Sequence, residues 1–261
     1  MKKKILAPVL FFAMNSVFAG PLYLVNNGTD NVYTVNVNNV SGTLLGNAGV
    51  NVIFGGLGFA ADGTLFGYTT STNSLYRVNT TNGNWSLVGA SGTTAGDTFD
   101  INPVTNKGYV TSFTGLHEIN LSTAQTTSVA PNASFFPASA FATDGTYYTL
   151  SGGALSTLNI STGISSLIGS TGIGETITNL AFNPDDGFLY SVGLSSATLW
   201  KINPLNASAT SLGVISGIET GGQYTMGTFQ VAASAVPEPA SMALMGLGLV
   251  GLALSRRRQT V

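Results

Sequence analysis

Short hydrophobic segments recur along the middle of the chain in a pattern that repeats five times. In one half of each unit, an aliphatic residue and a second, often aromatic residue lead to an aliphatic–Asn pair, as in Leu75-Tyr76-Arg77-Val78-Asn79. The five asparagines lie 43, 41, 39 and 44 residues apart, and they are Asn36, Asn79, Asn120, Asn159 and Asn203. Ten residues after each of them stands a small residue: Gly46, Gly89, Ala130, Gly169 or Gly213. This constant spacing indicates a repeat fold.

The other half of each unit is an apolar segment, a tight turn and a second apolar segment. It is clearest in Phe59-Ala60-Ala61-Asp62-Gly63-Thr64-Leu65-Phe66 and returns at residues 141–148, 182–190 and, most loosely, 101–109. Asp-Gly between apolar segments is typical of a β-hairpin, because Gly adopts the positive φ that the turn needs. Each unit therefore holds four short strands in about 42 residues, the size of a propeller blade.

The repeat is out of phase at the two ends of the region that carries it. Leu22-Tyr23 opens this region midway through a unit, and Tyr224 to Val231 form a lone apolar strand at its close. We therefore predict an all-β, five-bladed β-propeller over residues 20–233, in which the C-terminal strand completes the first blade and removes two free sheet edges. The repeats are similar to NHL and related propeller repeats. A β-sandwich built from repetitive strands is the alternative.

Residues 1–19 have the features of a secretory signal peptide. Lys2, Lys3 and Lys4 precede an apolar run from Ile5 to Met14, and Val17 and Ala19 supply the small residues that signal peptidase requires. Cleavage is expected between Ala19 and Gly20. The apolar run is too short to cross a bilayer as an uncleaved anchor, which takes about 20 residues.

Residues 234–261 form a tail of a different character. Val236-Pro237-Glu238-Pro239 is followed by an apolar run over residues 240–254 and then by three arginines, Arg256, Arg257 and Arg258. Proline disfavours the helix interior, so we expect a transmembrane helix over residues 240–254 that begins after Pro239. Fifteen helical residues rise about 22 Å, short of the ~30 Å hydrocarbon core, and arginine side chains can reach the interface. Arginines beyond the helix favour a cytoplasmic C-terminus, which places the propeller outside the inner membrane.

The order of these elements resembles the PEP-CTERM sorting signal of Gram-negative bacteria. Pro237, Glu238 and Pro239 match its motif and residues 256–258 match its basic cluster, so the resemblance covers only the tail. It implies that an exosortase recognises the tail of an inner-membrane intermediate and cuts near the motif. The protein then reaches the cell surface or the extracellular matrix, and the family is associated with exopolysaccharide. An anchor helix that is never processed is the alternative.

The charge and composition of residues 20–235 exclude several kinds of site. This region holds three basic residues, Arg77, Lys107 and Lys201, and ten of the eleven acidic residues, so its formal charge is −7. With no basic stripe, nucleic acid is not an expected partner. The chain has no cysteine, which excludes thiol catalysis, disulfides and zinc–thiolate sites. The only histidine is His117, which aligns with aromatic residues of the other units and is interpreted as a packing residue.

Candidate ligand-binding residues are sparse, and no catalytic residue is predicted. Propeller ligands usually sit near the central channel, where the innermost strands begin; the residues there include Asp97, Asp100, Glu175, Asn179, Glu219 and Gln223. Acidic residues around a channel could hold Ca²⁺, which prefers oxygen ligands, with Asp97, Asp100 and Glu175 as the candidates. By analogy with lactonase-type propellers, the alternative function is a secreted metal-dependent hydrolase or lactonase.

The favoured interpretation is a non-enzymatic protein with a structural or binding role in an exopolysaccharide matrix. The spacing of the acidic residues differs from unit to unit, so no shared ligand motif supports a channel metal. Trp85 and Trp200 are candidates for stacking on sugars, although both fall at strand positions where core packing is more common. The repeated asparagines and the Asp-Gly aspartates are interpreted as residues that bond to local backbone in turns.

Overall fold

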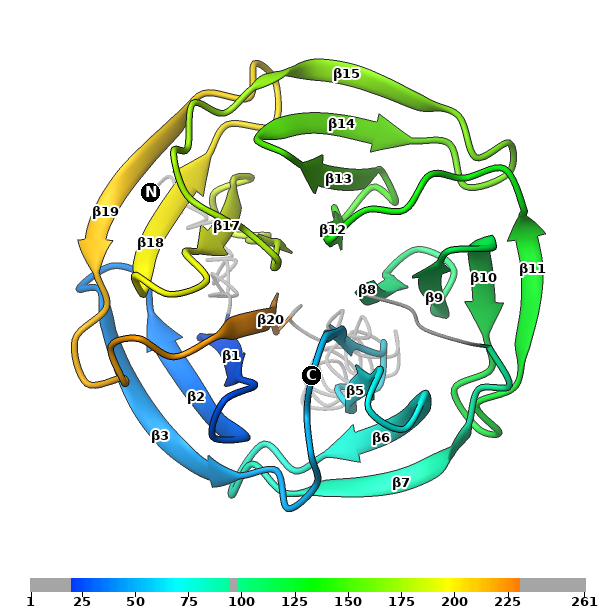
Figure 1. The fold of residues 1–261 in the computed structure, drawn as a ribbon, viewed down its shortest axis with the longest axis horizontal. Coiled ribbons are helices and arrows are strands. Elements are labelled where there is room, and N and C mark those ends of the chain that lie inside the picture. The colour runs from blue at the N-terminus through cyan, green and yellow to red at the C-terminus, as the bar shows by residue number, and fades with distance from the viewer. Residues whose placement is uncertain (1–19, 94–97, 231–261) are drawn as a thin grey trace, which may run out of the picture.

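The computed structural model describes residues 20–93 and 98–230, which form five four-stranded antiparallel sheets around a central axis (Figure 1). Blade 1 consists of β20 (Tyr224–Phe229), β1 (Leu22–Asn26), β2 (Asn31–Asn36) and β3 (Ser41–Asn47). Blade 2 consists of β4 (Gly55–Phe59), β5 (Leu65–Thr69), β6 (Ser74–Val78) and β7 (Trp85–Ala90).

The remaining blades follow in chain order. Blade 3 consists of β8 (Thr98–Asn102), β9 (Lys107–Ser112), β10 (Gly115–Ile119) and β11 (Thr126–Ala130). Blade 4 consists of β12 (Ala138–Phe141), β13 (Tyr147–Ser151), β14 (Ala154–Leu158) and β15 (Ser165–Ser170). Blade 5 consists of β16 (Ala181–Phe182), β17 (Leu189–Val192), β18 (Thr198–Ile202) and β19 (Ala209–Val214).

Blade 1 is built from both ends of the described chain. The C-terminal strand β20 pairs with β1, in a register that sets Leu22 opposite Phe229 and Leu24 opposite Gly227. This pairing confirms the five-bladed propeller that the C-terminal strand closes, and it rules out the β-sandwich. The predicted signal peptide, transmembrane helix and basic tail lie outside the described residues, among which no helix is long and apolar enough to cross a membrane.

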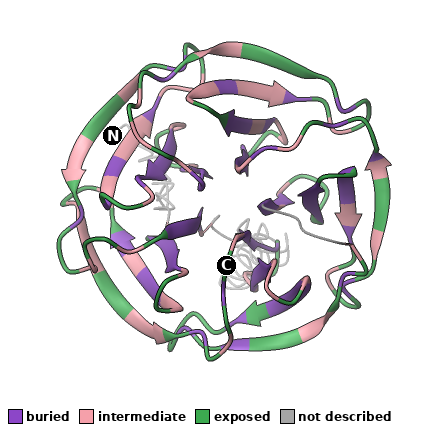
Figure 2. Cartoon of the chain, in the orientation of Figure 1, coloured by how far each residue is buried: buried purple, intermediate pink, exposed green. Residues whose placement is uncertain are grey.

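The hydrophobic core lies between adjacent blades. The innermost strands β4 and β20 are buried at every residue, whereas the outermost strands carry exposed and half-buried residues (Figure 2). One core cluster, for example, joins Tyr23 and Val25 of blade 1 to Leu57 and Phe59 of blade 2. We call the face where the innermost strands begin the top face, and the face where they end the bottom face.

The small residue ten positions after each repeated asparagine marks a β-bulge. In every blade the register between the third and fourth strands shifts at the same place, where Gly46, Gly89, Ala130, Gly169 or Gly213 pairs with the third strand. A Cβ atom on Gly46 would lie 2.0 Å from the carbonyl oxygen of Asn82 in blade 2, so a side chain there would collide with the neighbouring blade. Bulges also twist exposed edge strands away from further pairing.

The repeated asparagines bond to local backbone, as predicted. In each blade the Asn side-chain oxygen accepts a hydrogen bond from the backbone N–H two residues later, at 2.8–3.0 Å. The fifth position of the turn has positive φ and is occupied by Val40, Gly83, Ala124, Gly163 or Ala207. The two repeated positions therefore correspond to a turn, at the asparagine, and to a β-bulge, at the small residue ten positions later.

Candidate functional site: the central channel

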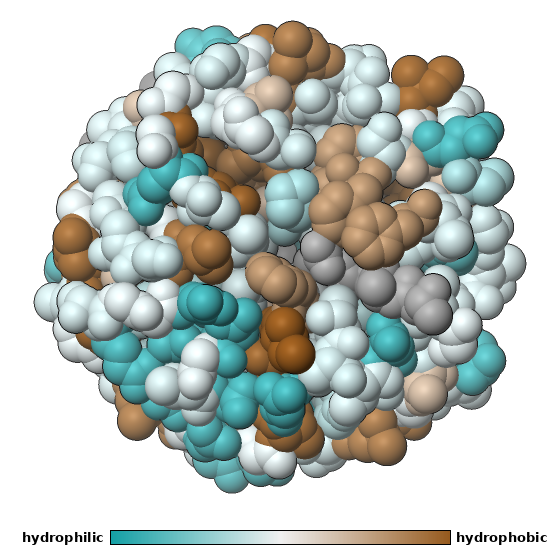
Figure 3. All heavy atoms as spheres, viewed as in Figure 1, coloured by the Kyte–Doolittle hydropathy of each residue, from teal (hydrophilic) through white to brown (hydrophobic). Residues whose placement is uncertain are grey.

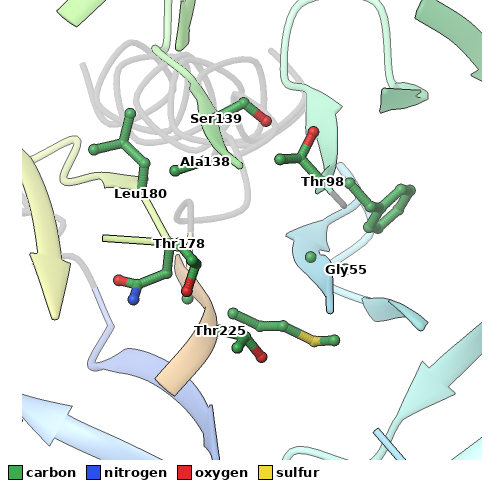
Figure 4. A pocket seen from close by; sticks show the side chains of 12 residues that line it. Gly55, Thr98, Ala138, Ser139, Thr178, Leu180 and Thr225 are labelled. Atoms are coloured by element: carbon green, nitrogen blue, oxygen red, sulfur yellow. The ribbon is translucent and has the colours of Figure 1, made fainter. Parts of the chain in front are cut away.

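Small and hydroxylated residues at the start of the innermost strands line the channel. Figure 4 shows Gly55, Thr98, Ala138, Thr178 and Thr225 around its axis. The strands converge so closely here that a Cβ atom on Gly56 would lie 2.0 Å from the carbonyl oxygen of Phe99. The cavity volume is about 10 Å³, close to the space one water molecule needs. A cavity of this size is far smaller than the pockets that hold organic ligands.

Asn179 occupies the channel wall as a structural clamp. Its side chain is buried, and Nδ2 donates to the backbone oxygens of Val192 at 2.7 Å and Tyr224 at 2.8 Å. Its Oδ1 accepts from the Val192 N–H at 2.8 Å. The two bonds to Val192 lie within blade 5, and the bond to Tyr224 joins blade 5 to the inserted strand β20, so the fold accounts for all the polar atoms of this amide.

Asp100 ties blade 3 to blade 4. Its two carboxylate oxygens accept from the backbone N–H groups of Ile101, in β8, and Phe141, in β12, both at 2.7 Å. Burial raises the pKa of Asp100 to about 7, and the two backbone hydrogen bonds oppose this shift. A shifted carboxyl is often a sign of function, but here the fold accounts for its position and its partners.

Glu175 and Glu219 brace hairpins on the top face. Glu175 accepts from Trp200 Nε1 and Ser196 Oγ, both at 2.6 Å. Glu219 accepts from Asn26 Nδ2 at 2.6 Å, and from Thr29 Oγ1 and Asn31 Nδ2 at 2.9 Å. Each glutamate precedes the innermost strand of its blade and bonds the hairpin between the second and third strands of the same blade. The sequence signal for this shared role is weak: an isoleucine shortly before a Glu-Thr pair in both loops.

The described residues do not fit the Ca²⁺ site that the sequence suggested. Asp100 and Glu175 lie in different blades, 3 and 5, and their carboxylate oxygens accept hydrogen bonds from protein donors. Asp97, the third candidate, lies outside the described residues. Within residues 20–93 and 98–230, no three acidic or histidine side chains form a group that could hold a metal ion.

The turn aspartates and the lone histidine have structural partners. Asp62, Asp144 and Asp186 each accept the backbone N–H two residues later, as turn chemistry predicted, and these hydrogen bonds lower the pKa of Asp62 and Asp144. His117 is buried, with Nε2 3.1 Å from Ser112 Oγ and 3.0 Å from Thr114 Oγ1, and burial lowers its pKa.

The two tryptophans present little ring surface to solvent. Trp85 is buried against Tyr76, with ring centroids 5.7 Å apart, and Trp200 is half-buried with its indole N–H bonded to Glu175. Larger depressions lie on the top face, where about 490 and 550 Å³ adjoin Glu175 and Glu219, and on the bottom face, where about 340 Å³ adjoins Asn36 and Asn183.

A family model for the PEP-CTERM protein-sorting motif matches residues 235–258. The match includes the Pro-Glu-Pro triplet and the three arginines, and it confirms the resemblance of the tail. The motif implies an exported, surface-sorted protein that is processed by an exosortase. Because the match covers only the tail, it carries no information about the propeller.

The propeller itself is similar to many solved structures. A chain in the crystal structure of a nidogen/laminin complex superposes with a TM-score of 0.57 and 10% sequence identity, over 81% of this chain and 98% of that chain. In all, 783 solved chains match, which shows the fold and selects no activity. A comparison with curated proteins found no match.

Proposed function

We propose that the protein is a non-enzymatic component of an exopolysaccharide matrix, where it has a structural or binding role. The sorting motif implies export and exosortase handling. The observation that supports a non-enzymatic role is the narrow channel: the cavity at its start is about 10 Å³ and is lined mostly by small, hydroxylated and apolar residues, and the nearby carboxylates and amides bond to protein.

In this proposal the helix over residues 240–254 holds the precursor in the inner membrane until an exosortase cuts near Pro237–Pro239. The propeller is then displayed at the cell surface or released into the matrix. Its rigid blades act as a scaffold that positions surface loops, which is where binding residues concentrate in such folds.

A secreted hydrolase or lactonase with a channel metal is the competing function. The raised pKa of Asp100 is the observation in its favour, because perturbed carboxyls gather at active sites. Such an enzyme would need free carboxylate oxygens that converge on one point, and Asp100 and Glu175 do not supply them.

Sorting is tested by replacing Glu238 with Gln and measuring the mass and membrane retention of the product. We expect an unprocessed precursor that stays in the membrane fraction. Ser234→Ala, just outside the matched segment, is the control and should be processed normally. A Glu238→Gln protein with the same mature mass as the wild type would contradict exosortase handling.

The non-enzymatic role is tested by metal analysis of the purified protein. We expect no metal ion to survive dialysis at one equivalent per chain. One tightly bound Ca²⁺ per chain, lost together with any esterase or lactonase activity in Asp100→Asn, would favour the hydrolase instead.

A further inference from the structure

Two stacked phenylalanines stand on the top face of the propeller. Phe113 lies in the hairpin turn between β9 and β10, and Phe135 lies in the loop between β11 and β12. Their ring centroids are 4.9 Å apart, with an angle of 16° between the planes, and Phe113 is 75% exposed. Figure 3 shows a hydrophobic patch on an otherwise mostly polar surface, in the region between β10 and β12.

The fold does not require an aromatic residue in this turn. The corresponding turns of the other four blades, at residues 27–30, 70–73, 152–153 and 193–197, contain no aromatic residue. Phe113 also contributes little to the core, because three quarters of its surface remains in water. Single exposed apolar residues occur elsewhere on this surface, as at Leu167 and Leu205, but two stacked aromatic rings form one contiguous apolar patch. A contiguous exposed apolar patch is typical of contact with a ligand or partner.

The two segments that carry the pair are polar but contain no charged residue. The turn at residues 112–115 and the loop at residues 131–137 contain no Lys, Arg, Asp or Glu. Beside Phe113, the hydroxyls of Ser112 and Thr114 lie 2.8 Å apart, and both contact the His117 ring. A surface that combines aromatic rings with hydroxyl and amide groups, and lacks charge, suits a neutral ligand that has both apolar and hydroxylated faces.

The position of the pair argues against a lipid partner. The sorting tail follows Gln230, which comes directly after Phe229 at the bottom end of β20, whereas Phe113 lies at the top end of β9. Nine residues, 231–239, separate Gln230 from Ala240, so the Cα atoms of these two residues lie at most about 36 Å apart. The described chain therefore ends on the face opposite the aromatic pair, which disfavours a bilayer contact of this pair in a propeller anchored through its tail.

We propose that the Phe113–Phe135 pair is a docking site for a neutral polysaccharide, with a sugar ring stacked on the exposed Phe113 ring. The exposed side chains of Thr114, Asn132 and Ser134, next to Phe113 or Phe135 in sequence, supply hydroxyl and amide groups for sugar hydroxyls, whereas the Ser112 hydroxyl is buried. This site rests on the proposed matrix role and names the surface that performs it.

The test is affinity electrophoresis of the full chain in detergent, through native gels that contain dextran, the neutral β-glucan laminarin, or the anionic polysaccharide alginate. Because the chain has no cysteine, Thr81→Cys on an exposed turn gives a single fluorescent label. We expect a neutral polysaccharide to retard the protein, and Phe113→Ser to weaken this binding about tenfold through loss of the stacking surface. Phe135→Ser should weaken polysaccharide binding less, because the Phe113 ring on which the sugar stacks is still present.

Leu167→Ser on the outer strand β15 is the matched control, because Leu167 is 72% exposed and lies far along the chain from the pair. It should bind as the wild type does, and all variants should unfold at the same temperature. If the wild type binds and Phe113→Ser binds equally well, or if Leu167→Ser loses as much affinity, the aromatic site is wrong while the matrix role stands. If the wild type binds alginate alone, the ligand is anionic, and the neutral-polysaccharide site is wrong while the matrix role stands. If the wild type binds none of the three polysaccharides, the site and a polysaccharide-binding role in the matrix are both overturned.

Discussion

The junction between blades 2 and 3 and the seam between blades 5 and 1 hold neighbouring blades together in different ways. Between blades 2 and 3, Tyr68 and Phe99 pack with ring centroids 6.4 Å apart, and Gly56 lets the backbone of Phe99 approach closely. The seam also has an apolar core, but it adds side-chain clamps and a short parallel bridge between Ser41 and Ser216.

The lengths of the innermost strands explain the difference. β4 and β8 have five residues each, whereas β16, beside the inserted strand β20, has two. Because β16 is so short, blade 5 contacts blade 1 over less backbone. The Asn179 side chain adds hydrogen bonds here, whereas apolar packing holds blades 2 and 3 together. The short strand β16 therefore accounts for the side-chain hydrogen bonds at this seam.

The largest expected effect comes from removing the seam clamp. Asn179→Ala leaves the buried N–H and carbonyl of Val192 without their side-chain partner and leaves the Tyr224 carbonyl only its bond from Thr178 Oγ1, at 3.3 Å. The free energy of unfolding should therefore fall by about 3 kcal/mol or slightly more. Urea denaturation measures this loss. Asn38→Ala, at an exposed turn position, is the control and should cost less than about 0.5 kcal/mol. Equal losses in the two variants would show that the seam does not depend on this amide.

A smaller, pH-dependent effect is expected at the junction of blades 3 and 4. The pKa of Asp100 is about 7 in the folded protein and about 4 in the unfolded chain, so the folded state binds the proton more tightly. The free energy of unfolding should therefore fall as the pH rises from 4 to 7, by about 3 kcal/mol from this group. Asp100→Asn should abolish that decrease.

The comparison is made by urea denaturation at pH 4.5, 6 and 7.5. Asp62→Asn is the control, because its exposed carboxyl has a lowered pKa and its contribution is already complete above pH 4. It should keep the wild-type decrease between pH 4.5 and 7.5. A wild-type protein whose stability follows the same pH course as Asp100→Asn would show that burial does not hold the carboxyl protonated.

The sequence predicted the ring but not the contacts that close it, and the reason is distance along the chain. Asn79 and Gly89 announce a turn and a bulge within ten residues, so five copies of this local signal were enough to count the blades. The bond between Asn26 and Glu219 joins residues 193 apart, and no local pattern marks such a pair. The repeat pattern placed aromatic residues in the core, and Phe113 was therefore not recognised as exposed. Its position in a turn is the only sign of exposure in the sequence.

The smallest expected effect lies at the blade 1 side of the seam, where the repeat is conformationally strained. Val40 has φ of +52° at the turn position that is Gly or Ala in the other four blades, and a β-branched residue adopts this conformation at a cost of about 1–2 kcal/mol. Asn tolerates this conformation better, so Val40→Asn should raise the free energy of unfolding by about 1 kcal/mol, reduced by the apolar packing that is lost.

Val37→Asn is the matched control. Val37 is also half-buried against the same core cluster but has no positive φ, so its replacement should only destabilise the protein. If urea denaturation shows that both variants lose stability equally, the packing of Val40 against the core contributes more than the backbone strain at this turn costs.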